Sequence, residues 1–278
     1  LTEPSVTDVR VMSGTKNART IVVTFDKVFN GGTATNLFQL VGAGRDRRFD
    51  TPHRPSTDDV RIETNQPVYE VVEDPITAVV TVTVSIHVPR GFAKNTFYQL
   101  TIDGTGTVFD ALSGLNGDLL DGELAGSFPS GDGVVGGDFV ALLGFGRKFS
   151  FTDGDGDDVS LSLHSPGNMA ITREAPIADG IRSEALTLRI TDTGRRSELT
   201  GRVTRRTGNG TTSFDLVTGL TGLRNNIQNN PSFVLGQVSA LVVDRVLDSR
   251  PSAYGRLNDL FEDLLFRRDF PIARQFST

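Results

Sequence analysis

Apolar and polar side chains alternate along most of the first 105 residues, and this pattern constrains the fold more than any other feature of the chain. Alternation sends one row of side chains into a core and the other into solvent, as in a strand of a half-buried sheet. About seven segments show it: Val6–Val11, Thr20–Phe25, Asn36–Val41, Asp58–Ile62, Val68–Val72, Ala78–Ile86 and Phe97–Ile102. Their number and short connections predict a β-sandwich of the immunoglobulin-like type.

The alternation stops between residues 103 and 138, where Gly, Asp, Asn and Ser dominate. Such a composition favours turns and loops, so we place a domain boundary there. Alternation resumes in five later segments: Lys148–Phe151, Asp158–Leu163, Ala185–Ile190, Leu199–Arg205 and Thr211–Val217. The sequence therefore predicts a mostly β chain with two β-sandwich-like domains, residues 1–138 and 139–278.

A helical pattern lies near the C-terminus. Apolar residues recur there at spacings of three and four: Tyr254, Leu257, Leu260, Phe261, Leu264 and Leu265. Pro251 precedes this run and Pro271 follows it, so we expect an amphipathic helix between them. It would pack on the chain's own sheet or dock onto another subunit.

The composition excludes several classes of protein. The chain has no Cys, which rules out disulfides, thiolate zinc sites and cysteine nucleophiles. It has no Trp and three Tyr, which disfavours the aromatic platforms of most sugar-binding modules. No apolar run approaches the roughly 20 residues that span a bilayer. Residues 1–145 carry 18 acidic and 11 basic side chains, which disfavours nucleic acid as a partner and suits divalent cations.

The strongest candidate site is the acidic turn from Thr152 to Asp158. Four carboxylates, those of Asp153, Asp155, Asp157 and Asp158, fall within six residues and would repel one another without a cation. Calcium takes about six to eight oxygen ligands, which a Gly-containing acidic loop can supply. An EF-hand loop is absent, because Asp158 and His164 stand where its Gly and Glu belong. The alternative is a solvated hairpin turn without an ion.

A second, more scattered acidic set lies in the Gly-rich stretch: Asp103, Asp110, Asn116, Asp118 and Asp121. If this loop folds back on itself, several of these side chains could share a second metal ion. The alternative is ordinary turn chemistry, in which Asp and Asn bond to nearby backbone groups.

Five arginines gather on one predicted hairpin: Arg195, Arg196, Arg202, Arg205 and Arg206. They form either an interaction patch, for acidic polysaccharide, nucleic acid or an acidic neighbouring subunit, or a solvated strand face that prevents aggregation. Because the first half of the chain is acidic, we consider a contact between the basic hairpin of one copy and the acidic surface of the next.

No motif predicts catalysis. The three histidines, His53, His87 and His164, are far apart, whereas a zinc site needs two or three close imidazoles. Neither the G-x-S-x-G turn of a serine hydrolase nor a phosphate-binding G-x-x-x-x-G-K-[ST] loop occurs. We therefore expect a protein that is not an enzyme.

One region resembles a known family. Asn95–Ile102 and then Val108–Leu115 are similar to the closing strand and turn of bacterial Ig-like domains, although Leu115 separates Gly114 from Asn116 where that family has Gly-Asn. Leu120–Gly133 resembles the linker that follows such domains in large secreted and surface proteins of planctomycete-type bacteria. The resemblance covers about residues 4–138 and implies a non-catalytic extracellular building block.

Together these features predict an extracellular or cell-surface structural and assembly module, stabilised by calcium. Its expected partners are other copies of itself or neighbouring surface proteins. We expect no membrane span in this chain. The alternative is an adhesin or a carbohydrate-recognition module.

Overall fold

The structure, a computed structural model, consists of strands and loops. It describes residues 3–14, 18–29, 37–43, 49, 58–73, 79–89, 92–105, 111–124, 127–175, 185–218 and 223–240. These ranges contain 16 strands in three sheets and no helix, so the prediction of a mostly β chain is confirmed. The amphipathic helix expected between Pro251 and Pro271 lies outside the described residues and stays a prediction.

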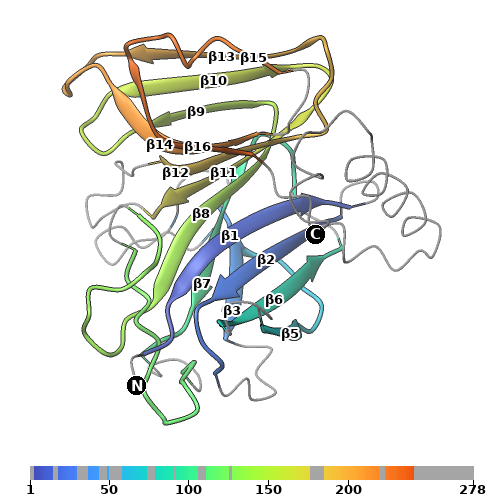
Figure 1. Cartoon of the computed structure of the whole chain (residues 1–278), viewed down its shortest axis with the longest axis vertical. Helices are drawn as coiled ribbons and strands as arrows, with labels where there is room; N and C mark the ends of the chain where they lie inside the picture. Colours follow the sequence, from blue (N-terminus) through green and yellow to red (C-terminus); the bar gives the residue numbers. More distant parts are fainter. Residues whose placement is uncertain are drawn as a thin grey trace, which may run out of the picture. The chain divides into compact units, whose positions relative to one another are not determined.

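The first sheet has four antiparallel strands in the order β1-β2-β6-β5 (Figure 1). They are β1 (Val6–Ser13), β2 (Arg19–Phe25), β6 (Val80–Val88) and β5 (Val68–Glu73). Along β6 every second residue from Val82 to Val88 is buried, and the residues between them are only partly buried. The sequence alternation therefore gives this sheet one core face and one outer face.

The second sheet has eight strands in the order β16-β14-β12-β11-β8-β7-β3-β4. They are β16 (Phe233–Ala240), β14 (Thr212–Thr218), β12 (Ala185–Thr191), β11 (Asn168–Glu174), β8 (Phe139–Gly146), β7 (Phe97–Ile102), β3 (Phe38–Gly42) and β4 (Val60–Arg61). Neighbours are antiparallel except that β14 runs parallel to both β12 and β16. This sheet contains strands from both halves of the chain.

The third sheet has the order β15-β13-β10-β9 (Figure 1). Its strands are β15 (Leu223–Asn225), β13 (Ser197–Thr204), β10 (Asp158–His164) and β9 (Lys148–Thr152). The predicted hairpin that carries the five arginines is wrong, because β13 pairs with neither of its neighbours in the sequence, β12 and β14. β13 pairs with β10 and β15, whereas β14 lies in the eight-stranded sheet, so residues 205–211 cross from one sheet to the other.

The two four-stranded sheets cover opposite faces of the eight-stranded sheet. On β8, Phe139, Ala141, Leu143 and Phe145 belong to the core beneath β1, β2 and β6. Gly144 points the other way, where a Cβ atom would lie 2.6 Å from the Phe149 ring of the second core. The described part of the protein thus forms two sandwich-like units that share the eight-stranded sheet.

The boundary predicted at residue 138 falls between β7 and β8, which pair with each other. The first hydrophobic core lies on both sides of this boundary, since Phe139 and Leu143 belong to it, whereas the buried residues of the second core all follow the boundary. The Gly-rich stretch before it is more than a linker, since Leu112 and Leu120 are fully buried in the first core. The division into two domains stays a prediction.

Two buried arginines brace the layers. Arg19 on β2 is 1% exposed, and its guanidinium carbon lies 4.2 Å from the centroid of the Phe145 ring. Arg173 on β11 lies 4.0 Å from the Phe151 ring and donates a hydrogen bond to the Thr152 carbonyl. This contact holds the end of β9, where the predicted calcium turn begins.

Candidate functional site

The acidic turn predicted to bind calcium connects β9 to β10. The Asp153 carboxylate caps it, because its Oδ1 atom accepts hydrogen bonds from the N–H groups of Gly156 (3.1 Å) and Asp157 (2.8 Å). Gly156 has a φ of +101°, which glycine adopts without strain. The local sequence therefore explains the shape of this turn, and it directs Asp153 inwards.

A second loop, residues 205–210, lies against this turn. Asp157 accepts hydrogen bonds from the backbone N–H groups of Arg206 (2.7 Å), Gly208 (3.0 Å) and Gly210 (2.5 Å). Asp155 Oδ2 accepts another from the N–H of Asn209 at 2.8 Å. These bonds join the β9–β10 turn to the segment that crosses between sheets.

The carboxylates of Asp153, Asp155 and Asp157 form a compact group, with one oxygen of each within 4.8 Å of the others. Asp153 is 1% exposed and Asp157 is fully buried. Asp155 Oδ1 is buried and accepts no hydrogen bond within the described part of the chain. Three negative charges so close together are compatible with a bound cation. All three residues offer carboxylate oxygens, which are the ligands that calcium prefers.

Asp158, the fourth residue of the predicted set, lies outside this group. It begins β10, and its Oδ2 atom forms an ion pair of 2.5 Å with Nε of Arg206. The structure thus brings three of the four predicted residues together.

The electrostatic surroundings of Asp157 favour its charged form. Burial alone would raise the pKa of this carboxyl, but hydrogen bonds from the N–H groups of Arg206, Gly210 and Gly208 lower it, as does the charge of Arg205. The pKa lies below its ordinary value, so Asp157 is ionised at neutral pH.

The second predicted set does not come together among the described residues. Asp103 Oδ1 accepts a hydrogen bond from the N–H of Thr105 at 3.0 Å. Asn116 and Asp118 bond to each other in an exposed turn. Asp110 lies outside the described residues. For Asp103, Asn116 and Asp118 the observed contacts are turn chemistry.

Asp121 instead joins a group that the sequence reading missed, with Glu123 and Asp132. One oxygen of each lies within 4.8 Å of the others. Asp121 holds the loop that follows, accepting hydrogen bonds from the N–H groups of Asp132 and Gly133, both at 3.0 Å. The only signal in the sequence was that all three acids lie in the same Gly-rich stretch.

Glu123 has the most unfavourable surroundings of this second group. Its Oε2 atom is buried and has no hydrogen-bond partner within the described ranges. Burial raises the pKa of Glu123, and the negative charges of Asp132 and Asp121 raise it further. The fold therefore favours the neutral acid at this position.

The five arginines of the predicted patch are exposed but spread along β13. Arg195 and Arg196 precede the strand, Arg202 lies within it, and Arg205 and Arg206 follow it. At about 3.3 Å per residue the eight residues of β13 separate the two end pairs by roughly 25 Å. Any partner that contacts all five arginines must span this distance.

Two of the three histidines can be placed, and they lie on different sheets. His87 lies one residue before the end of β6, with Nδ1 at 3.5 Å from Thr20 Oγ1, and His164 is exposed at the end of β10. His53 lies outside the described residues.

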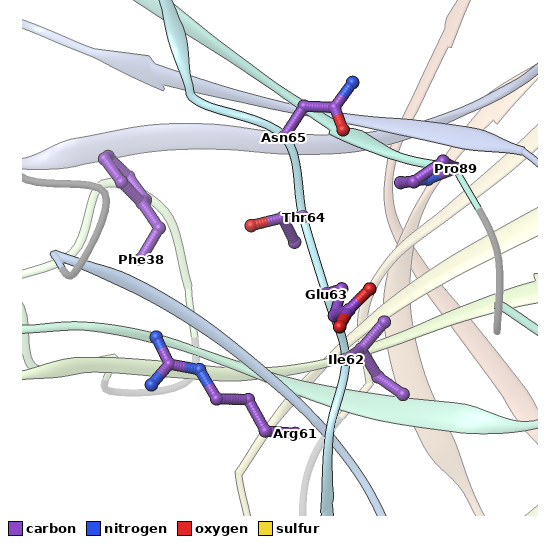
Figure 2. Close-up of a pocket in the computed structure, with 7 residues that line it drawn as sticks. All are labelled: Phe38, Arg61, Ile62, Glu63, Thr64, Asn65 and Pro89. Atoms are coloured by element: carbon purple, nitrogen blue, oxygen red, sulfur yellow. The ribbon is translucent and has the colours of Figure 1, made fainter.

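A pocket of about 560 Å³ opens at the edge of the first sandwich (Figure 2). Beside it, residues 62–65 cross from the eight-stranded sheet to the four-stranded sheet. The Ile62 N–H donates to the Leu40 carbonyl on β3 (2.8 Å), and the Asn65 N–H donates to the His87 carbonyl on β6 (2.9 Å). The pocket is lined by Phe38, Arg61, Ile62, Glu63, Thr64, Asn65 and Pro89.

Comparison of this chain with protein-family models, with curated proteins and with solved structures found no match. The likeness of residues 4–138 to bacterial Ig-like domains therefore stays a prediction. Within the described ranges, no helix has the length and apolar character needed to cross a membrane.

Proposed function

We propose that this chain is a non-enzymatic structural module of an extracellular or cell-surface protein, stabilised by calcium at Asp153, Asp155 and Asp157. The observation that carries the proposal is the convergence of these three carboxylates, with Asp155 Oδ1 buried and without a hydrogen-bond donor among the residues that the structure describes. A cation there would offset the mutual repulsion of the three charges.

Calcium at this position would act on the architecture rather than on a reaction. The turn holds the end of β9, and through Asp157 and Asp155 it holds the segment that crosses from β13 to β14. An ion that fixes both loops would brace the third sheet against the eight-stranded sheet. Such bracing suits a module that carries load or keeps a fixed shape in a calcium-rich medium.

Assembly with further copies, or with neighbouring surface proteins, is the second part of the proposal. The exposed side chains Glu70 and Glu73 lie on β5, at one edge of the first sheet. The exposed arginines lie along β13 of the third sheet. Opposite charges on different sheets favour a head-to-tail contact between copies.

Thermal unfolding tests the calcium site. We expect millimolar calcium, compared with EDTA, to raise the Tm of the wild-type chain, because an ion that binds only the folded state stabilises it. At a concentration of 100 times Kd the gain is about 2.7 kcal/mol, or roughly 5–10 °C. Asp155→Asn should remove this rise, whereas Asp118→Asn, in an exposed turn outside both acidic groups, should keep it.

A wild-type Tm that calcium leaves unchanged would contradict the proposal and make the turn a purely hydrogen-bonded one. Repeating the melt at two protein concentrations tests assembly, since the Tm of an associating protein rises with concentration.

The alternative function, carbohydrate recognition, is favoured by one observation, the pocket beside β4.

A further inference from the structure

The pocket beside β4 has a structural cause. The first sandwich is open at this edge, because β4 has only two residues and the chain then leaves the eight-stranded sheet for the other layer. Phe38, which is 3% exposed and belongs to the first core, and Pro89, which follows β6, lie on opposite sides of the opening (Figure 2). A volume of about 560 Å³ is within the range of small-ligand sites, roughly 300–1,000 Å³.

The polar side chains around the pocket have no partner among the described residues. The side chains of Arg61, Glu63, Thr64 and Asn65 make no hydrogen bond or ion pair to any other residue that the structure describes. Within residues 61–65 they supply a guanidinium, a carboxylate, a hydroxyl and an amide, and only Ile62 is apolar. Together they offer both donors and acceptors at short range.

The charges around the pocket balance, and this narrows the class of ligand. Arg61 is positive and Glu63 is negative, so an anion would be attracted by one of these side chains and repelled by the other, and the same holds for a cation. A purely apolar ligand would leave all four polar groups without partners, which costs free energy wherever water is displaced. A neutral ligand with several hydroxyl groups can bond to carboxylate, guanidinium and amide alike, and its C–H face can contact Ile62 and Pro89.

We infer that this pocket binds a neutral sugar unit of a polysaccharide or glycan. Recognition rests on hydrogen bonds from the 61–65 segment and not on ring stacking, in keeping with the absence of Trp. The site lies beside the first core and shares no residue with the acidic turn of the third sheet. The inference therefore goes beyond the proposed calcium-stabilised module and stands without it.

Saturation-transfer NMR of the full chain tests the inference, with neutral tetrasaccharides of glucose, mannose and galactose as probes and oligogalacturonate as the acidic comparison. We expect transfer to at least one neutral probe, in EDTA as well as in calcium. Glu63→Ala and Asn65→Ala should each weaken that binding by about tenfold or more, since each removes hydrogen bonds to the ligand. Lys148→Ala, an exposed position on β9 outside the pocket, should leave it unchanged.

Absence of transfer to all three neutral probes overturns the inference. So does binding that Glu63→Ala and Asn65→Ala leave intact, because the sugar would then lie elsewhere. A preference for oligogalacturonate that Arg61→Ala removes would make this an anion site and overturn it as well. Binding that is lost in EDTA would place the sugar at a calcium ion and contradict the inference. Failure of calcium to raise the Tm bears only on the proposed calcium-stabilised module.

Discussion

Two acidic residues of this protein, the buried Asp157 and the partly buried Glu123, show how the same functional group acquires opposite properties. Asp157 receives three backbone N–H groups, which favour the carboxylate, so its pKa lies below the ordinary value. Burial raises the pKa of Glu123 above its ordinary value, and the charges of Asp132 and Asp121 raise it further, while Glu123 Oε2 has no donor within the described part of the chain. The number of donors, rather than burial alone, decides the sign of the shift.

Replacing Glu123 by Gln tests this account. Because the folded-state pKa of Glu123 is raised, its contribution to stability is fully present below the unfolded value of 4.5 and is lost as the pH rises through the folded pKa. In EDTA we expect Glu123→Gln to raise the Tm at pH 7 and to leave it nearly unchanged at pH 4. Melts across this pH range, with Asp118→Asn as the control, measure the difference. A lower Tm for Glu123→Gln at pH 7 would show that the charged form stabilises the fold.

At the scale of secondary structure, alternation in the sequence predicts most of the strands, and two of the strands it misses are buried on both faces. All seven segments expected before residue 105 are strands, β1 to β7. The sequence analysis missed β8 and β11, which are buried almost throughout. β8 reads Phe-Val-Ala-Leu-Leu-Gly-Phe-Gly, and such a strand shows no alternation because neither of its faces meets water.

The same limit applies to the candidate sites. Asp153, Asp155 and Asp157 lie within five residues, so their convergence could be predicted from a single turn. The loop that bonds to them, residues 205–210, comes close only because β10 pairs with β13. Glu123 and Asp132 meet Asp121 through loop folding that no short-range pattern encodes. The pocket depends in turn on where the chain changes sheets.

Gly144 on β8 provides a test of the doubly buried strand. A Cβ atom there would lie 2.6 Å from Phe149 and 2.9 Å from Ile171, in the second core. Overpacking of this kind costs roughly 1–3 kcal/mol, so Gly144→Ala should lower the free energy of unfolding by that amount. Chemical denaturation measures it, and Ser150→Ala, on the exposed face of β9, should change it little. An unchanged stability would mean that the two sheets do not pack closely at β8.

At the scale of the whole molecule, the eight-stranded sheet links the two cores. β1, in the first four-stranded sheet, contacts the eight-stranded sheet through two side chains. Thr172 Oγ1 donates a hydrogen bond to the Val9 carbonyl (3.3 Å), and Arg189 forms an ion pair with Asp8 at 3.2 Å. Met169 and Ile171, on the other face of β11, belong to the second core. A disturbance of β8 or β11 therefore reaches both layers.

This sharing makes a fragment that ends at residue 138 a decisive test of the predicted domain boundary. Such a fragment lacks Phe139, Ala141, Leu143 and Phe145, all of which are buried in the first core. A large apolar side chain stabilises a fold by about 1.5–3 kcal/mol when buried, and a whole domain is stable by only about 5–15 kcal/mol. We therefore expect the fragment of residues 1–138 to give no cooperative unfolding transition. The fragment of residues 1–175 retains β8 and β11, and we expect it to regain the circular dichroism spectrum of a β-sheet. A cooperative transition for residues 1–138 alone would show that the first layer folds without β8, and that the boundary at 138 separates independent domains.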